Sequence, residues 1–183
     1  MKTIELWKAY EMEFLANIQV NDFYDTEVDV AFTHNETSET LVVPAFWDGG
    51  FTWRVRFAPI KLGVWSYTVK ETKGVPLGID GIKGEVNAVP YEGDIEIYKR
   101  GFVKTDKSLK YFIYDDGTPF FYLGDTHWTM PTEEFDSAGP HAGDIKTDSH
   151  FKYIVDKRVE QGFTVYQSAP IGHGWNINDC KFS

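Results

Sequence analysis

The sequence predicts a mainly β protein, in which an antiparallel β-sandwich is followed by a short β-hairpin and one βαβ unit. Up to about residue 90, bulky and polar residues alternate with a period of two, as they do in half-buried antiparallel strands. Turn residues interrupt the alternation about every 8 to 14 positions, a spacing typical of sandwiches. Beyond about residue 100, a segment of helical periodicity lies between two short apolar runs, which indicates the βαβ unit.

Four segments of the first half show the alternation most clearly. Each directs its bulky residues to one face of the pleat and its polar residues to the other, so the bulky set is the predicted core. These sets are Tyr10, Met12 and Phe14; Val28, Val30 and Phe32; Phe51, Trp53, Val55 and Phe57; and Trp65, Tyr67 and Val69. With turns at residues 21–22, 48–50, 62–63 and 80–81, they predict about seven or eight strands and no helix in this half.

The pattern changes in the second half. The alternation weakens over residues 90–100, which we interpret as a linker between a domain at residues 1–92 and another at residues 93–183. Residues 110–114 and 119–123 flank a DDGT turn and predict a hairpin.

A helix is predicted over residues 148–161, followed by a strand over residues 163–169. Apolar residues at helical spacing define the helix: Phe151, Ile154, Val155 and Val159. Thr147 or Asp148 is the predicted N-cap, and Gly162 is the predicted stop. In a βαβ unit the two strands are parallel neighbours.

One βαβ unit cannot cover both faces of a parallel sheet. If the second half begins a (β/α)8 barrel, or TIM barrel, which takes about 250 residues, most of the barrel is missing. We therefore expect residues 93–183 to be the N-terminal fragment of a barrel in a longer protein. A parallel edge left open after residue 169 is adhesive, so we expect either disorder there or pairing with another polypeptide, such as the remainder of the barrel.

Composition excludes several classes of protein. The 183 residues contain 18 Lys and Arg against 28 Asp and Glu, a net charge of −10 that disfavours nucleic acids and anionic membranes as partners. No window approaches the roughly 18 apolar residues of a transmembrane helix. Cys180 is the only cysteine, so an intrachain disulfide is excluded. The N-terminus lacks a signal peptide pattern, from which we expect a cytoplasmic protein.

Several motifs carry a family resemblance. Residues 43–49 (VPAFWDG), 53–59 (WRVRFAP) and 63–67 (GVWSY) resemble the Ig-like N-terminal domain that precedes the barrel of many bacterial glycoside hydrolases. Residues 116–128 (DGTPFFYLGDTHW) resemble the opening of the catalytic barrel in the apiosidase-like glycoside hydrolases of bacteria. Residues 158–167 (RVEQGFTVYQ) are similar to the first helix and second strand of that barrel.

The resemblance implies a retaining-type hydrolase that acts on plant-type polysaccharides or oligosaccharides. It also implies that a carboxylic general acid and a carboxylate nucleophile lie on later barrel strands, beyond residue 183. Such a pair stands about 5 to 5.5 Å apart at the carboxyl ends of different strands. No catalytic residue is therefore assigned, and we expect the chain alone to be inactive.

Five residues are candidates for sugar binding, because they follow the two predicted barrel strands. They are Asp125, His127, Trp128, His173 and Trp175. Asp125 either bonds sugar hydroxyls or caps the loop that follows it. His127 either orients a hydroxyl or a catalytic carboxylate, or it packs against the backbone.

The aromatic and loop candidates have alternatives of the same kind. Trp128 and Trp175 either stack on pyranose rings or pack in the protein, while His173, between two glycines, is interpreted as a loop histidine. No metal-ligand spacing such as HExxH occurs, so neither a metal nor another cofactor is expected.

Two other functional classes stay open. In the first, the sandwich is a non-catalytic carbohydrate-binding or interaction module, which requires a pair of exposed coplanar aromatics. Trp47 beside the turn at residues 48–50 is the tryptophan best situated for this, whereas Trp53 and Trp65 belong to inward sets. In the second, the sandwich is only a structural spacer. The carbohydrate substrate is the expected partner in the leading hypothesis.

Overall fold

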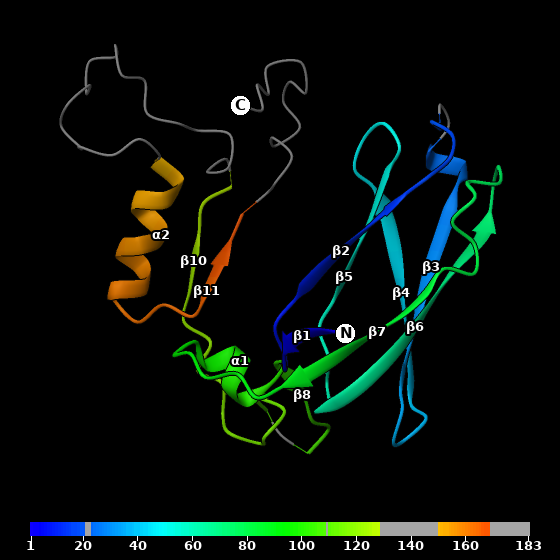
Figure 1. Cartoon of the computed structure of the whole chain (residues 1–183). Coiled ribbons are helices and arrows are strands. Elements are labelled where there is room, and N and C mark those ends of the chain that lie inside the picture. Colours follow the sequence, from blue (N-terminus) through cyan, green and yellow to red (C-terminus); the bar gives the residue numbers. More distant parts are fainter. Residues whose placement is uncertain (21–22, 109, 129–149, 169–183) are drawn as a thin grey trace, which may run out of the picture. The chain divides into compact units, whose positions relative to one another are not determined.

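The computed structural model describes residues 1–20, 23–108, 110–128 and 150–168, which form a mainly β structure (Figure 1). The chain divides into two compact units. The first comprises Met1–Thr105 and Ile113–Thr118, and the second comprises Asp106–Phe112 and Pro119–Ser183. Within the described ranges, no helix has the length and apolar character needed to span a membrane.

A seven-stranded, mostly antiparallel sheet forms the first unit. Its strands are β1 (Lys2–Glu5), β2 (Tyr10–Leu15), β3 (Glu27–His34), β4 (Thr40–Trp47), β5 (Thr52–Phe57), β6 (Gly63–Lys73) and β7 (Lys83–Val89). Their order in the sheet is β1-β7-β6-β3-β4-β5-β2. A short 3-10 helix, η1 (Phe23–Asp25), precedes β3. The one parallel pair of this sheet, β1 with β7, departs from the predicted antiparallel pattern.

The predicted inward sets form the core of this sheet. Met12, Phe14, Val28, Val30, Phe32, Trp53, Val55, Phe57, Trp65 and Val69 are all buried. Tyr10 and Tyr67 are partly buried and pack against this core. Phe51 is the clear exception, because it lies in the turn before β5 and is 49% exposed. The period-two reading is therefore confirmed for residues inside the strands.

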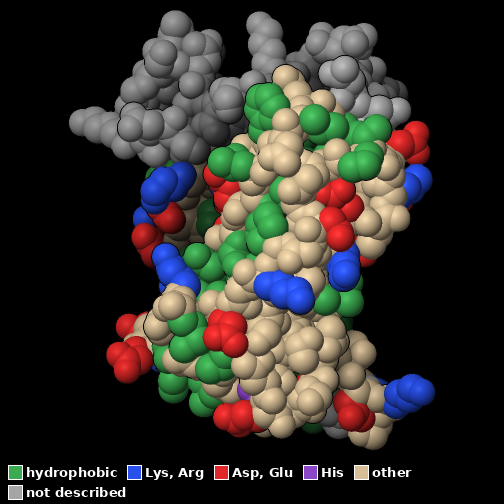
Figure 2. Space-filling view, turned by 45° about the vertical axis from the view of Figure 1, so that its right-hand side comes forward, with side chains coloured by type: hydrophobic (Ala, Val, Ile, Leu, Met, Phe, Trp, Pro, Cys, Tyr) green, Lys and Arg blue, Asp and Glu red, His purple; other side chains and the backbone are tan. Residues whose placement is uncertain are grey.

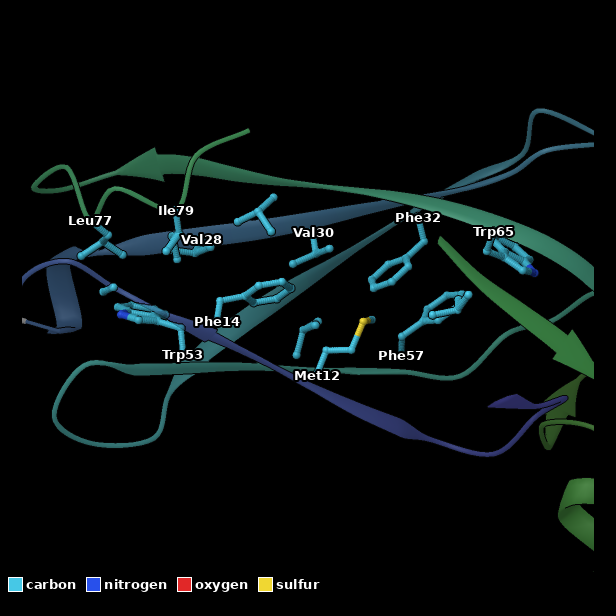
Figure 3. Close-up of a cluster of buried hydrophobic side chains, with 14 of the residues drawn as sticks. Met12, Phe14, Val28, Val30, Phe32, Trp53, Phe57, Trp65, Leu77 and Ile79 are labelled. Carbon is cyan, nitrogen blue, oxygen red and sulfur yellow. The ribbon is translucent and has the colours of Figure 1, made fainter. Parts of the chain in front are cut away.

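β4 changes partners along its length, which brings distant parts of the sheet face to face. Residues 40–45 pair with β3, and Phe46 and Trp47 pair with β5. The rings of Phe32 on β3 and Phe57 on β5 stack with centroids 3.8 Å apart, although β4 separates these strands in the sheet order. Figure 3 shows the side chains of β2 and β5 pointing toward those of β3 and β6.

A carboxylate anchors the long connection between β6 and β7. Glu71 accepts hydrogen bonds from the backbone N–H groups of Leu77 (2.9 Å), Ile79 (2.7 Å) and Asp80 (2.9 Å). Leu77 and Ile79 are both fully buried. The connection is thus fixed at its polar side by Glu71 and at its apolar side by the core.

The segment predicted as a linker contains a helix, α1 (Glu96–Arg100). The sequence interpretation missed it because the helix is short and charged. An ion pair between Glu96 and Arg100, one turn apart, supports it. Arg100 also donates to Asp116 (3.2 Å) and Thr118 (2.9 Å) in the DDGT turn.

The predicted turn forms next to two very short strands, β8 (Lys104–Thr105) and β9 (Phe112–Ile113), which pair with each other. The N–H of Tyr114 donates to the carbonyl of Thr118 (2.8 Å), and that of Phe120 donates to Phe112 (2.8 Å). These bonds confirm that the chain reverses at residues 115–118.

The second unit contains the predicted strand, helix and parallel strand. They are β10 (Gly124–Thr126), α2 (His150–Glu160) and β11 (Val165–Gln167). Gly124, Asp125 and Thr126 pair in parallel with Val165, Tyr166 and Gln167. The first strand begins at residue 124 rather than 119, because the carbonyl of Leu123 accepts the N–H groups of Thr164 and Val165 at the entry to β11.

Gly162 ends α2 as predicted. Its φ of 81° is a left-handed conformation that other residues adopt at a cost. The N–H of Gly162 donates to Val159 (2.9 Å) and that of Phe163 to Arg158 (2.9 Å), which is the Schellman arrangement. The predicted N-cap, Thr147 or Asp148, lies outside the described residues.

Candidate functional site

Asp125 lies in the middle of β10 and connects this strand to α2. Its Oδ2 accepts a hydrogen bond from Nε of Arg158, and its Oδ1 accepts the N–H of Thr126 (2.9 Å). The Arg158 guanidinium, and to a smaller extent the Thr126 N–H, hold the pKa of Asp125 below its ordinary value, although partial desolvation acts in the opposite direction. Asp125 is therefore ionised at neutral pH, which suits a hydrogen-bond acceptor and not a proton donor.

Arg158 is itself fixed by two further contacts. Its Nη1 donates to Oε1 of Gln161 (2.8 Å), and its guanidinium lies 5.1 Å from the ring centre of Phe163. Side chains from the end of α2 and the following turn thus hold the partner of Asp125 in one orientation.

The contacts of β10 and β11 define which face of the strand pair α2 covers. Asp125 and Tyr166 are neighbours in register, and both contact α2: Asp125 through Arg158, and Tyr166 through the ring of Phe151 at 6.3 Å. Because side chains alternate along a strand, the next pair in register, Thr126 and Gln167, faces the other side. Both of these residues are exposed.

Sequence reasoning missed Thr126 and Gln167 as candidate site residues. They lie at the carboxyl ends of both strands, on the face that α2 leaves free. The signal available in the sequence was the alternation of side-chain direction along a strand, which places Thr126 and its neighbour Asp125 on opposite faces. That signal is useful only once the face covered by the helix is known.

His127 and Trp128 follow β10 directly. The N–H of His127 donates to the carbonyl of Gln167 (3.0 Å), so the parallel pairing continues one residue past the strand. Trp128 is 49% exposed, an exposure compatible with ring stacking. His173 and Trp175 lie outside the described residues. The structure therefore brings together Asp125, His127 and Trp128 on one strand end.

The described part of the chain contains no group of three or more His, Cys, Asp or Glu side chains that could hold a metal ion. The polar groups at the strand ends are an ionised carboxylate, an imidazole, a hydroxyl and an amide. Such groups bind and orient hydroxylated ligands through hydrogen bonds.

The comparisons with known proteins agree with the motifs. Residues 106–178 match the family model described as "Apiosidase-like, catalytic domain". This chain is similar to the apiosidase-like glycoside hydrolases. Residues 3–72 match a second model, "Domain of unknown function (DUF5060)". All five predicted sugar-binding residues fall within the apiosidase-like segment, as do Thr126 and Gln167.

A solved structure supports the same resemblance. It is a "putative glycoside hydrolase" from Bacteroides vulgatus, with 27% sequence identity and a TM-score of 0.60 over 74% of this chain. This chain spans 24% of the length of that structure. No curated protein is similar enough to count as a match.

Proposed function

We propose that residues 93–183 are the opening of a (β/α)8 barrel that hydrolyses glycosidic bonds in plant-type polysaccharides or oligosaccharides. The observation that carries the proposal is the parallel β10–α2–β11 unit within the segment that matches the apiosidase-like catalytic domain. In such barrels, helices cover the outside and substrates bind at the carboxyl ends of the strands. The general acid and the nucleophile come from later barrel strands, beyond residue 183.

The orientation of the side chains suggests how this end of the barrel works. Thr126 and Gln167 are on the face without a helix, which is the interior of a barrel, and Trp128 lies at the same carboxyl end. We propose that they contact the sugar together with His127. Asp125, on the face that α2 covers, stays ionised through Arg158 and orients the strand end.

In this proposal, residues 1–92, which belong to the first unit, form an Ig-like sandwich that supports the barrel. The face-to-face packing of Phe32 and Phe57 supports the sandwich architecture. A second candidate function, carbohydrate binding without cleavage, is favoured by one observation: Tyr24 is 84% exposed beside other aromatic rings.

Reducing-sugar release from aryl glycosides and pectic oligosaccharides tests the hydrolase proposal. We expect no release by the 183-residue chain and measurable release by a polypeptide extended through a complete barrel. Turnover by the 183-residue chain would contradict the placement of the acid and nucleophile on later strands. An extended polypeptide that binds these sugars without cleaving them would favour the second candidate.

A further inference from the structure

Three aromatic rings from two segments meet at one end of the first unit. The ring of Phe23 is stacked on Trp47, with centroids 4.5 Å apart and planes inclined by 19°. The same ring contacts Tyr24 at 4.3 Å with an inclination of 35°. Figure 1 shows that η1, which carries Phe23 and Tyr24, lies at the same end of the sheet as the turn after Trp47. We name these three residues the aromatic platform.

The inner part of the platform is fixed before any ligand arrives. Phe23 and Trp47 pack against the hydrophobic core, so their rings have little freedom. The indole N–H of Trp47 donates to the carbonyl of Gly50 (3.0 Å), which fixes its orientation. A rigid aromatic surface loses little conformational entropy when it binds a ligand.

The backbone of η1 is held from the other side by the end of β6. Lys73 pairs with Asp25 (3.1 Å) and with Glu27 (3.5 Å). A Cβ atom at Gly74 would lie 2.9 Å from the carbonyl oxygen of Asp25, so only glycine allows this close approach. The residue that follows Phe23 in this fixed helix, Tyr24, nevertheless has 84% of its surface exposed. The Tyr24 ring, in contact with Phe23, therefore presents most of its surface to solvent.

The chemistry around the rings selects one class of ligand. Aromatic faces stack on the apolar faces of sugar rings, and carboxylates accept hydrogen bonds from hydroxyl groups. Asp25 next to Tyr24 and Asp48 next to Trp47 supply exposed carboxylates. Lys73 and Arg54 pair with these carboxylates, so the charges at this end are compensated, which favours an uncharged ligand. In Figure 2, acidic side chains lie next to hydrophobic ones in the upper part of the face shown.

We propose that the aromatic platform, Tyr24 with Phe23 and Trp47, binds a neutral sugar ring of a polysaccharide. This inference rests on the proposed function, because it makes the first unit a substrate-binding domain beside the hydrolytic one. Tyr24 provides the outer stacking surface, and Phe23, itself stacked on Trp47, supports it. Binding at this platform does not require glycosidic cleavage.

Affinity electrophoresis of the 183-residue chain in gels that contain soluble xyloglucan or arabinogalactan tests the proposal. We expect the polysaccharide to retard the chain. Tyr24→Ala should weaken the interaction about tenfold or more, and Tyr24→Phe, which keeps the ring, should retain it within about threefold. The matched control is Tyr111→Ala, which removes a tyrosine that is 52% exposed in the other unit and should change retardation less than twofold, on the order of experimental error.

Three outcomes would overturn the proposal. They are no retardation of the unsubstituted chain, equal retardation of Tyr24→Ala, and an equal loss in the Tyr111→Ala control. Light scattering tests the alternative that the platform binds a second copy of the chain. If the chain is a dimer, does not bind sugar, and becomes a monomer in the Tyr24→Ala variant, the platform is a self-association surface. The experiment measures binding and not cleavage. Its result therefore tests the platform even if the hydrolase proposal is refuted.

Discussion

The anchoring of the β6–β7 connection by Glu71 can be tested by replacing this residue. Glu71→Ala removes the acceptor of three backbone N–H groups, two of which belong to the fully buried residues Leu77 and Ile79. Glu71→Gln keeps one oxygen and places an amide NH2 opposite a backbone donor. We therefore expect both variants to destabilise the first unit, the alanine variant more strongly.

The size of the effect follows from the environment of the three donors. Hydrogen bonds to charged groups contribute about 1.5 to 3 kcal/mol each. The N–H of Asp80 is exposed and can bond to water after the substitution, whereas those of Leu77 and Ile79 are partly buried. Counting only the latter two at the lower value gives about 3 kcal/mol for Glu71→Ala and about half of that for Glu71→Gln. The melting temperature should fall by about 15 °C for the alanine variant.

Urea denaturation followed by tryptophan fluorescence measures this loss, because Trp53 and Trp65 are buried in the same core. Glu85→Ala is the control, since Glu85 is exposed and accepts one long bond from Ser66 (3.3 Å). Its effect should stay within about 0.5 kcal/mol. If Glu71→Ala is as stable as the control, or if Glu71→Gln is fully stable, the carboxylate does not anchor the connection.

Three further substitutions test the core, the backbone and the strand-end ion pair. Phe57→Ala should cost about 3 to 5 kcal/mol in urea denaturation, while Val42→Ala, at a side chain 61% exposed, should change little. Gly81→Ala, at a φ of 75° with no atom near the added Cβ, should lower the free energy of unfolding by about 1 to 2 kcal/mol. Gly74→Ala, at a φ of 95°, places its Cβ 2.9 Å from the carbonyl oxygen of Asp25 and should therefore destabilise the protein clearly more in thermal unfolding. Because the pKa of Asp125 is lowered by folding, its ion pair stabilises the folded state above the unfolded pKa of about 4 and is lost as pH falls below it. Limited proteolysis of Asp125→Asn should therefore be faster than that of the parent chain at pH 7, and the difference should shrink as pH falls through the lowered pKa of the folded state. A difference that does not change with pH would contradict the ion pair.

The strands of the first half could be predicted from the sequence because burial on one face imposes a period of two. Met12, Val30 and Trp65 were identified in this way, and all are buried. The parallel pairing of β1 with β7 could not be predicted, since it joins residues more than eighty positions apart, roughly the whole length of the first unit, and leaves no mark on the alternation. α1 was missed for a related reason, because its five residues are too few to show helical periodicity.

The sequence could indicate that a strand lies around Asp125, but not the direction in which its side chains point. The motif around Asp125 indicated the end of the first barrel strand, but the strand includes Asp125 instead of preceding it. Whether Asp125 or Thr126 faces away from α2 depends on Arg158, which lies 33 residues further along the chain. No local pattern contains that information.

The aromatic platform illustrates the same limit and its physical cause. Trp47 could be identified from its place beside a turn, but Phe23 stacks on it from a different segment, and only their contact makes the stack of rings on which Tyr24 lies. That surface owes its rigidity to the core beneath Phe23 and Trp47 and to the glycine that lets β6 approach η1. Because binding energy is lost when a flexible group must be ordered, the residues that stabilise this end of the sheet also raise the affinity that Tyr24 can provide.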